Sequence, residues 1–286
     1  MSAHRLPGSG PLMVFGGPYS NLEATRALRA LATAKGIAPE NCICTGDLVA
    51  YCARPNDTLA QIREWGCTAI MGNCEESLVA QAIDCGCGFE AGSACDALSI
   101  DWYRFASARV TAEEREWVAQ LPRQLGFQWN GLDIHVTHGA PSKTNRFLFA
   151  SSKASSKREE LDSTPAHVML AGHCGIPFGE TFDRENGDQG YWLNSGAIGM
   201  PANDGTADGW YLLLEPLAER VRASWHRLHY DAHSEQRSMI AEGLDNGYAR
   251  ALTSGLWPSM DVLPAAEREQ RGIALQPPAL MIEPNH

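Results

Sequence analysis

Four short apolar segments of the sequence each end, beside a glycine, in a residue that can bind a metal ion. These residues are Asp47, Asn73, His138 and His173. Each alone has an ordinary explanation, because Asp and Asn beside Gly are common turn residues and a single His at a strand end is usually hydrogen-bonded within the fold. Together, two imidazoles, a carboxylate and an amide oxygen form a plausible ligand set for Zn²⁺, Mn²⁺ or Fe²⁺. The combination therefore favours a metal site over four unrelated turns.

The elements that must position these side chains are predicted to alternate between strands and helices. Strands are expected over 12–15, 42–44, 68–71, 132–137 and 168–171, and helices over 21–35, from about 75, and over 111–121. This rhythm is typical of an α/β sheet, in which the carboxyl ends of strands converge on one edge where ligands bind. We therefore expect the four candidate ligands to meet at one point.

The remaining segments are predicted to be less regular. Residues 84–110 are rich in Gly, Cys and Ser and suggest a long loop, while 151–160 suggest a polar surface loop or a fraying helix. Strands are expected over most of 191–230 and a helical tail over 234–254, and the Pro-rich last 25 residues are expected to be loosely ordered. Neither an internal repeat nor a strong linker divides the chain.

Composition excludes some classes of partner. Asp and Glu number 34 against 23 Lys and Arg, so the formal net charge of −11 argues against broad binding to nucleic acid or to a membrane surface. No apolar run approaches the roughly 18 residues of a spanning helix, and the N-terminus lacks signal-peptide features. A cytoplasmic location is expected, in which the nine cysteines would be thiols or ligands rather than disulfides. The oligomeric state is left open.

The order of these motifs resembles the calcineurin-like metallophosphoesterases, especially their small bacterial phosphodiesterase-like branch. That family carries Asp-x-His, Gly-Asp, Gly-Asn-His-Asp/Glu, His-Gly and Gly-His-x-His in sequence. The corresponding segments here are FGGPYSNLEA (15–24), TGDLVAY (45–51), MGNCEESL (71–78), VTHGAP (136–141) and AGHCGIPFG (171–179), followed by LNSGAIGMPANDGTADGWYLLLE (193–215). The resemblance implies a four-layer αββα sandwich of the α/β class. It predicts a metallophosphoesterase-like domain over residues 1–230, with a helical C-terminal tail over 231–286 packed on the same domain.

The departures from the family pattern are specific. Gly17-Pro18-Tyr19 stands in place of the first Asp-x-His, and Gly175 in place of the last histidine. The resemblance assigns all three missing groups to the first of two metals, whereas the residues matching the second metal's ligands, Asp47, Asn73, His138 and His173, are retained. We therefore predict a single divalent transition metal, Zn, Fe or Mn.

The cysteines leave several interpretations open. Cys74 stands where the family has a histidine that assists the leaving group, and Cys174 follows His173 directly. A thiol is a weaker proton donor at neutral pH than an imidazole, yet either sulfur could ligate the metal, unless both simply fill buried space. Cys85 and Cys87, with Cys95 and the strand residues Cys42 and Cys44, could bind a second metal, form a redox-sensitive pair or serve packing.

Candidates for substrate binding follow His138. Lys143 and Arg146 could direct a phosphate toward the metal, while Lys153, Lys157 and Arg158 are somewhat better explained as a solvated basic loop. Tyr19 could bind substrate, act as an extra metal ligand, occupy the vacated metal position or be filler.

These observations lead to one main prediction and two alternatives. The main prediction is a divergent phosphoesterase of a small phosphorylated metabolite or nucleotide, with Asp47, His138 and Cys74 as catalytic residues and a metal that lowers the pKa of a bound water. The first alternative is a catalytically silent family member that binds a ligand or partner and uses its metal for structure or sensing. The second is altered redox chemistry with iron and a thiol.

Overall fold

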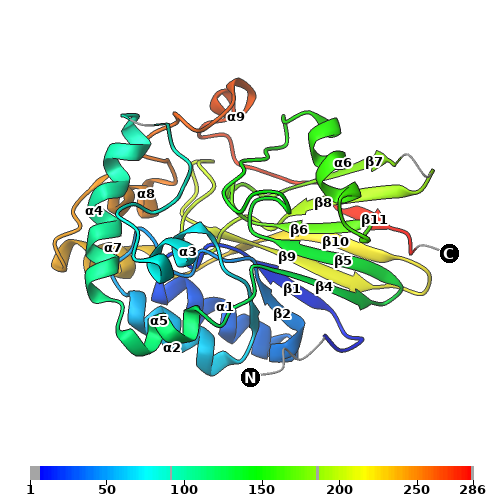
Figure 1. Ribbon diagram of the computed structural model, residues 1–286, viewed down its shortest axis with the longest axis horizontal. Coiled ribbons are helices and arrows are strands. Elements are labelled where there is room, and N and C mark those ends of the chain that lie inside the picture. The colour runs from blue at the N-terminus through cyan, green and yellow to red at the C-terminus, as the bar shows by residue number, and fades with distance from the viewer. Residues whose placement is uncertain (1–6, 91, 185–186, 285–286) are drawn as a thin grey trace.

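The computed structural model describes residues 7–90, 92–184 and 187–284, and shows two β-sheets packed face to face with helices on their outer sides (Figure 1). The first sheet has the order β11-β10-β9-β1-β2-β3, and the second β4-β5-β6-β8-β7. The strands of the first sheet are β1 (Leu12–Phe15), β2 (Cys42–Cys44), β3 (Thr68–Ala69), β9 (Gly209–Pro216), β10 (Val221–Leu228) and β11 (Leu280–Ile282). Those of the second are β4 (Gln124–Trp129), β5 (Leu132–Thr137), β6 (Val168–Ala171), β7 (Phe178–Asp183) and β8 (Gln189–Asn194). The predicted αββα class is confirmed.

The parallel strands of both sheets bring their carboxyl ends together. β1, β2 and β3 run parallel in the first sheet, as do β5, β6 and β8 in the second. A bridge between Gly16, which follows β1, and Ala197, which follows β8, links the two sheets at this edge. The loops after these strands therefore share one region, as expected for a ligand site in an α/β fold.

Alternating apolar residues explain how one strand contributes to two cores. In β1, Leu12 and Val14 face the core between the sheets, where they meet residues such as Ile134 of β5. Met13 and Phe15 face the helices on the outer side. Because both faces of the strand are buried, the whole run is apolar, as is usual for strands covered on both sides.

The helices cover the two sheets unequally. The outer face of the first sheet packs against α1 (Leu22–Ala34), α2 (Pro55–Trp65), α4 (Ala94–Arg109), α7 (Ala232–Ala241) and α8 (Gly247–Ser254). The second sheet carries α6 (Ala154–Asp162), and the short helices are η1 (Pro39–Asn41), α3 (Asn73–Ala80), α5 (Ala112–Val118) and α9 (Ala265–Glu269). The predicted helix over 21–35 is confirmed as α1, with Asn21 as its N-cap.

The structure decides the expectations about the irregular segments. Residues 84–110 are not one loop, because Ser93 caps α4, which buries Ser99, Trp102, Tyr103 and Ala106 at helical spacing. For residues 151–160 the helical alternative is the correct one, since most of them form α6. The explanation of Lys157 as part of a solvated loop is wrong, because its side chain is fully buried in an ion pair with Glu180.

Residues 262–284, which fall in the predicted loosely ordered tail, are more ordered than expected. They include α9, and β11 pairs antiparallel with β10 and closes one edge of the first sheet. Within the residues that the structure describes, no helix combines the length and apolar character needed to cross a bilayer.

Candidate metal centre

The Asp47 carboxylate is positioned by a tight turn after β2. Gly46 and Asp47 both adopt left-handed backbone conformations, with φ of 99° and 56°. Glycine is required at 46 because a Cβ atom there would lie 2.6 Å from the backbone nitrogen of Gly72. The turns that carry Asp47 and Asn73 can therefore touch.

Glu75 fixes these two turns relative to each other. Its buried carboxylate accepts hydrogen bonds from the backbone nitrogens of Asp47 (2.8 Å), Gly72 (2.8 Å) and Val49 (3.0 Å). Burial raises the pKa of Glu75 to about 7, with repulsion from Asp47 as the next cause. Glu75 is thus a positioning residue that we did not single out from the sequence, although it lies within the segment 71–78 that resembles the family motif.

Asn73 begins α3 and presents its amide oxygen to the site. Its Nδ2 atom donates a hydrogen bond to the backbone oxygen of Cys85 at 3.0 Å. Because that bond uses the donor end of the amide, the Oδ1 atom is directed toward His138 at 3.1 Å. The orientation suits an oxygen ligand.

His138 follows β5, and its ring orientation is set by Thr45. The Nδ1 atom donates to the Thr45 backbone oxygen at 2.7 Å, since a carbonyl can only accept. The Nε2 atom consequently faces the site. A metal-binding histidine usually has its second nitrogen held in this way.

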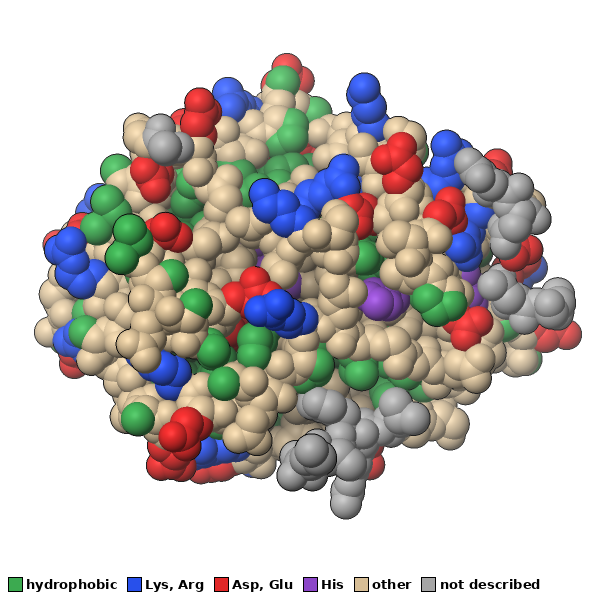
Figure 2. All heavy atoms as spheres, viewed as in Figure 1, with side chains coloured by type: hydrophobic (Ala, Val, Ile, Leu, Met, Phe, Trp, Pro, Cys, Tyr) green, Lys and Arg blue, Asp and Glu red, His purple; other side chains and the backbone are tan. Residues whose placement is uncertain are grey.

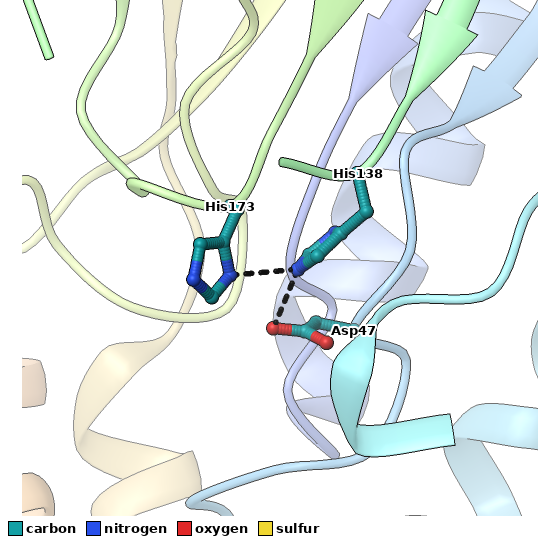
Figure 3. A group of neighbouring side chains, drawn as sticks. All are labelled: Asp47, His138 and His173. Carbon is teal, nitrogen blue, oxygen red and sulfur yellow. Dashed lines mark hydrogen bonds and ion pairs between the residues drawn. The ribbon is translucent and has the colours of Figure 1, made fainter. Parts of the chain in front are cut away.

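The four predicted ligands converge on one point. The Nε2 atom of His138 lies 3.2 Å from Asp47 Oδ2 and 2.9 Å from His173 Nδ1 (Figure 3). The same atom lies 3.1 Å from Asn73 Oδ1. The ligand atoms of Asp47, His138 and His173 all lie within 4.8 Å of one another, and all four side chains are buried. Ligands of a tetrahedral metal ion about 2.0 Å away lie about 3.3 Å apart, so the donor set fits a divalent transition metal.

The charges at the site reinforce this arrangement. Burial opposes ionisation of Asp47, but attraction to His138 outweighs it and lowers the pKa of Asp47. Burial disfavours protonation of His138, but attraction to Asp47 and a hydrogen bond raise its pKa. Burial and repulsion from His138 lower the pKa of His173 to about 3, so its imidazole is neutral and able to act as a ligand at neutral pH.

Three departures from the family pattern lie together on one side of this centre. Tyr19 is buried with its ring against Gly17, where a Cβ atom would overlap the ring. A Cβ atom at Gly175 would lie 3.6 Å from Trp257 and 3.8 Å from the Tyr19 hydroxyl. Aromatic side chains thus surround the positions that the family resemblance assigns to the first metal.

The cysteines divide into a bonded pair and free thiols. Cys85 and Cys87 form a disulfide, and the other seven cysteines are free. The bond contradicts the general expectation of reduced thiols but agrees with the interpretation of these two cysteines as a redox-sensitive pair. Burial raises the pKa of Cys74 well above its usual value and that of Cys174 to about 12, which favours their neutral thiols. Neither sulfur belongs to the compact group formed by Asp47, His138 and His173.

The basic residues predicted to bind substrate do not line the cavity at the site. Arg146 forms an ion pair with the buried Glu160, and Lys143 is exposed. Neither is among the residues lining the cavity that borders Asp47 and His173. On the face shown in Figure 2, lysines and arginines are interspersed with acidic side chains.

Comparisons with known proteins agree with this fold and site. The model of the calcineurin-like phosphoesterase superfamily domain matches residues 20–216, so the chain belongs to this superfamily. The superfamily uses divalent metal ions, and Asp47, His138 and His173 form a candidate ligand group.

Individual relatives are distant. A metallophosphoesterase from Sphaerobacter thermophilus is 20% identical, with a TM-score of 0.65 over 87% of this chain and 100% of that structure. A hypothetical protein from Pyrococcus horikoshii OT3 is 15% identical, with a TM-score of 0.66 over 86% and 98%. An uncharacterized protein from Methanocaldococcus jannaschii is 22% identical over 83% of this chain and 95% of its own length. At these identities the structures support the fold.

Proposed function

We propose that the protein is a phosphoesterase that hydrolyses a small phosphorylated molecule with the help of one divalent transition metal. The observation that carries the proposal is the convergence of Asp47, Asn73, His138 and His173 in a member of this superfamily. The aromatic side chains beside Gly17 and Gly175 support a single metal, because they lie where further ligands would be needed.

A bound divalent metal would polarise a phosphoryl oxygen and lower the pKa of a nearby water. The chain's own residues orient that chemistry. Thr45 and Cys85 hold His138 and Asn73 with their ligand atoms facing inward, and Glu75 fixes the turns on which Asp47 and Asn73 lie.

Two further side chains could move or hold a proton. Burial raises the pKa of Tyr19 well above its usual value, so its phenol stays protonated and can donate a hydrogen bond to a phosphoryl oxygen. Cys74 is the proposed proton donor to the leaving group because of its place beside the predicted ligands, where its Sγ atom accepts a hydrogen bond from Asn73 at 3.5 Å. Burial raises its pKa, which keeps the thiol protonated but makes it a weak acid. Lys143 remains a candidate for contacting the phosphate because it is exposed.

The alternative is a silent family member that binds a ligand or partner. The specific observation in its favour is the replacement of the leaving-group histidine by Cys74, whose burial disfavours the thiolate. Under this alternative the metal centre would stabilise the fold or sense a ligand without turnover.

Two measurements distinguish the phosphoesterase from the silent family member. They are elemental analysis of protein purified without added metal and a screen of phosphomonoesters and phosphodiesters. We expect one metal per chain, lost in His138→Ala and retained in His135→Ala. His135 lies within β5, the strand that precedes His138, and its ring bonds Gln124 instead. Hydrolysis should disappear in Asp47→Asn with the circular dichroism spectrum unchanged. One metal without turnover on any phosphoester would favour the silent protein, and two metals per chain would contradict the single-metal site.

A further inference from the structure

The cavity beside the metal centre has aromatic walls and almost no charge. Its aromatic side chains are Tyr19, Tyr51, Phe89, Phe147, Tyr248 and Trp257. Among the described residues that line the cavity, Asp47 and His173 are the only ones with an acidic, basic or imidazole side chain. Both belong to the candidate metal centre. A ligand group that enters this cavity therefore meets rings rather than countercharges.

The aromatic wall is in direct contact with the metal centre. The ring centroids of Phe147 and His173 lie 4.1 Å apart. Tyr19 packs edge-on against Tyr51, with 4.8 Å between their ring centroids. Tyr51 in turn stacks on Tyr248 at 4.4 Å. A substrate with its phosphoryl group at the metal centre would place its next atoms among these rings.

Trp257 lines the cavity from outside the matched domain. It lies beyond residues 20–216 and is held by two hydrogen bonds, from its backbone nitrogen to Asn203 Oδ1 at 2.8 Å and from its Nε1 atom to the Pro201 oxygen at 2.6 Å. Its ring is the side chain nearest to Gly175, where the family has a metal ligand. A fixed ring thus lies where the family resemblance places part of the first metal site.

The size of the cavity limits what it can hold. The cavity volume, measured over the positions that the centre of a water molecule can occupy, is about 60 Å³. That is room for roughly four to six waters, or on the order of 150 Å³ of liquid, which is comparable to one small ring.

From these observations we infer that the cavity binds an uncharged aromatic ring on the ester side of the substrate. The substrate class is then a phosphoester of a small aromatic alcohol, rather than a polyphosphate or a multiply phosphorylated metabolite. This inference rests on the proposed function, because it identifies the group next to the phosphoryl moiety. The missing countercharge disfavours a second anion, and stacking against fixed rings favours a planar group.

Binding of non-hydrolysable probes to the metal-containing protein tests the inference by calorimetry. Benzylphosphonate should bind at least tenfold more tightly than methylphosphonate, and phosphonoacetate, which adds a carboxylate, should bind no better than methylphosphonate. Benzyl alcohol, which has the ring but no phosphonate group, should bind weakly and compete with benzylphosphonate. Equal affinity for benzylphosphonate and methylphosphonate, or tighter binding of phosphonoacetate, would overturn the inference.

Variants locate the ring. Trp257→Ala should weaken benzylphosphonate by roughly two- to tenfold and leave methylphosphonate unchanged, since one stacked ring is lost. Trp117→Ala removes a similarly part-buried ring on α5, outside the cavity, and should alter neither affinity. Val262→Trp, which fills the cavity from another wall, should also reduce the advantage of the benzyl group. An unchanged advantage in Trp257→Ala and Val262→Trp would contradict the assignment.

The outcome is separable from that of the proposed function. Benzyl selectivity without hydrolysis of any phosphoester would retain the ring site and reject the phosphoesterase. Hydrolysis without benzyl selectivity would retain the phosphoesterase and reject the ring site.

Discussion

At the scale of single residues, the centre depends on Glu75 as much as on the ligands it positions. Three backbone nitrogens donate to its carboxylate, and two of them belong to the turns of Asp47 and Asn73. Glu75→Gln replaces one acceptor oxygen by a donor that faces an N–H group. We expect metal affinity to fall by about tenfold or more and unfolding free energy by about 1–3 kcal/mol.

Metal titration and urea denaturation measure these two effects. Glu76→Gln is the matched control, because Glu76 lies on the same helix and pairs with the exposed Arg123. It should change stability by less than about 1 kcal/mol. If Glu76→Gln weakened metal binding as much as Glu75→Gln, the positioning role would be wrong.

Gly17 and Tyr19 are predicted to be coupled. Gly17→Asp would restore a family carboxylate, but its Cβ atom would overlap the Tyr19 ring. We expect this variant to lose about 2 kcal/mol or more, because the ring is buried and cannot move freely. In Gly17→Asp/Tyr19→His the smaller ring should relieve the overlap. The double variant should therefore be more stable than the sum of the two single effects by about 1 kcal/mol.

A double-mutant cycle from urea denaturation checks this coupling. Additive effects would show that Gly17 is not constrained by Tyr19. Metal content provides a second readout, and we expect the double variant to remain at one metal per chain because Gly175 still lacks a ligand side chain.

The candidate metal ligands could be predicted from the sequence, whereas the residues that position them could not. Asp47, Asn73, His138 and His173 each stand at the carboxyl end of an apolar run, and that position already predicts convergence. Glu75 occupies the third position of a helix, where an acidic residue is common for local reasons. Only the folded turns show which backbone nitrogens its carboxylate meets.

At the scale of elements, the Cys85–Cys87 disulfide connects the loop before α4 to the metal centre through the bond from Asn73 to Cys85. Unfolded protein should release seven thiols before reduction and nine after it, since the other seven cysteines are free. The bond closes a very short loop, so Cys85→Ser/Cys87→Ser should cost only about 1–2 kcal/mol in unfolding free energy. Nine thiols before reduction would contradict the disulfide.

A second element-level prediction concerns the turn before β9. Asp204 accepts hydrogen bonds from Arg227 of β10 at 2.7 Å and from the backbone of Leu275 at 3.0 Å. Burial opposes its ionisation, but the hydrogen bonds outweigh burial and lower the pKa of Asp204. We expect Asp204→Asn to reduce unfolding free energy at pH 7 by about 1.5–3 kcal/mol.

The sign of the pH effect follows from the lowered pKa. The ionised carboxylate stabilises the folded protein above the unfolded-state pKa of about 3.9, and this contribution is lost as the pH falls through the folded-state value. The difference between wild type and Asp204→Asn in urea denaturation should therefore narrow from pH 5 downward. Asp245→Asn, which removes an exposed ion pair with Arg250, should show a small effect with little change over the same range. A constant Asp204→Asn difference down to pH 3 would contradict the assignment.

Elements with strong periodicity were predictable, and those defined by pairing were not. The helix α1 has a clear apolar stripe, an N-cap and a glycine after its end. In contrast, α4 carries small and polar residues on its buried face, such as Ser99 and Ala106, which conceal its amphipathic pattern. β7 and β11 are edge strands, and each is defined by pairing with a single neighbour, β8 and β10 respectively.

At the scale of the whole molecule, the first and last strands of the described chain belong to the same sheet. β1 lies in the interior of the first sheet, and β11 forms its edge beside β10. The segment between α8 and β11 crosses from the aromatic cavity to this edge, passing through Trp257 and α9. Residues beyond the matched domain thus contribute both to the cavity and to closure of the core.

The last strand should therefore stabilise the entire fold. Ile282 is 0% exposed in the core between the sheets, whereas its neighbour Met281 is 44% exposed. Successive side chains of a strand point to opposite faces, so alanine substitutions at these two positions affect different contributions to stability. Both variants keep the backbone pairing of the strand, but only the substitution of Ile282 removes a buried side chain. Ile282→Ala should lower unfolding free energy by about 2–4 kcal/mol, and Met281→Ala by less than about 1 kcal/mol.

Urea denaturation followed by both tryptophan fluorescence and far-ultraviolet circular dichroism measures these changes. If β11 belongs to the common core, Ile282→Ala shifts both transitions together to lower urea, because the core between the sheets unfolds as one cooperative unit. If the strand were only an appended segment, Ile282→Ala and Met281→Ala would have equally small effects and the main transition would stay in place. The difference between these neighbouring residues therefore decides whether the C-terminal strand is part of the cooperative fold.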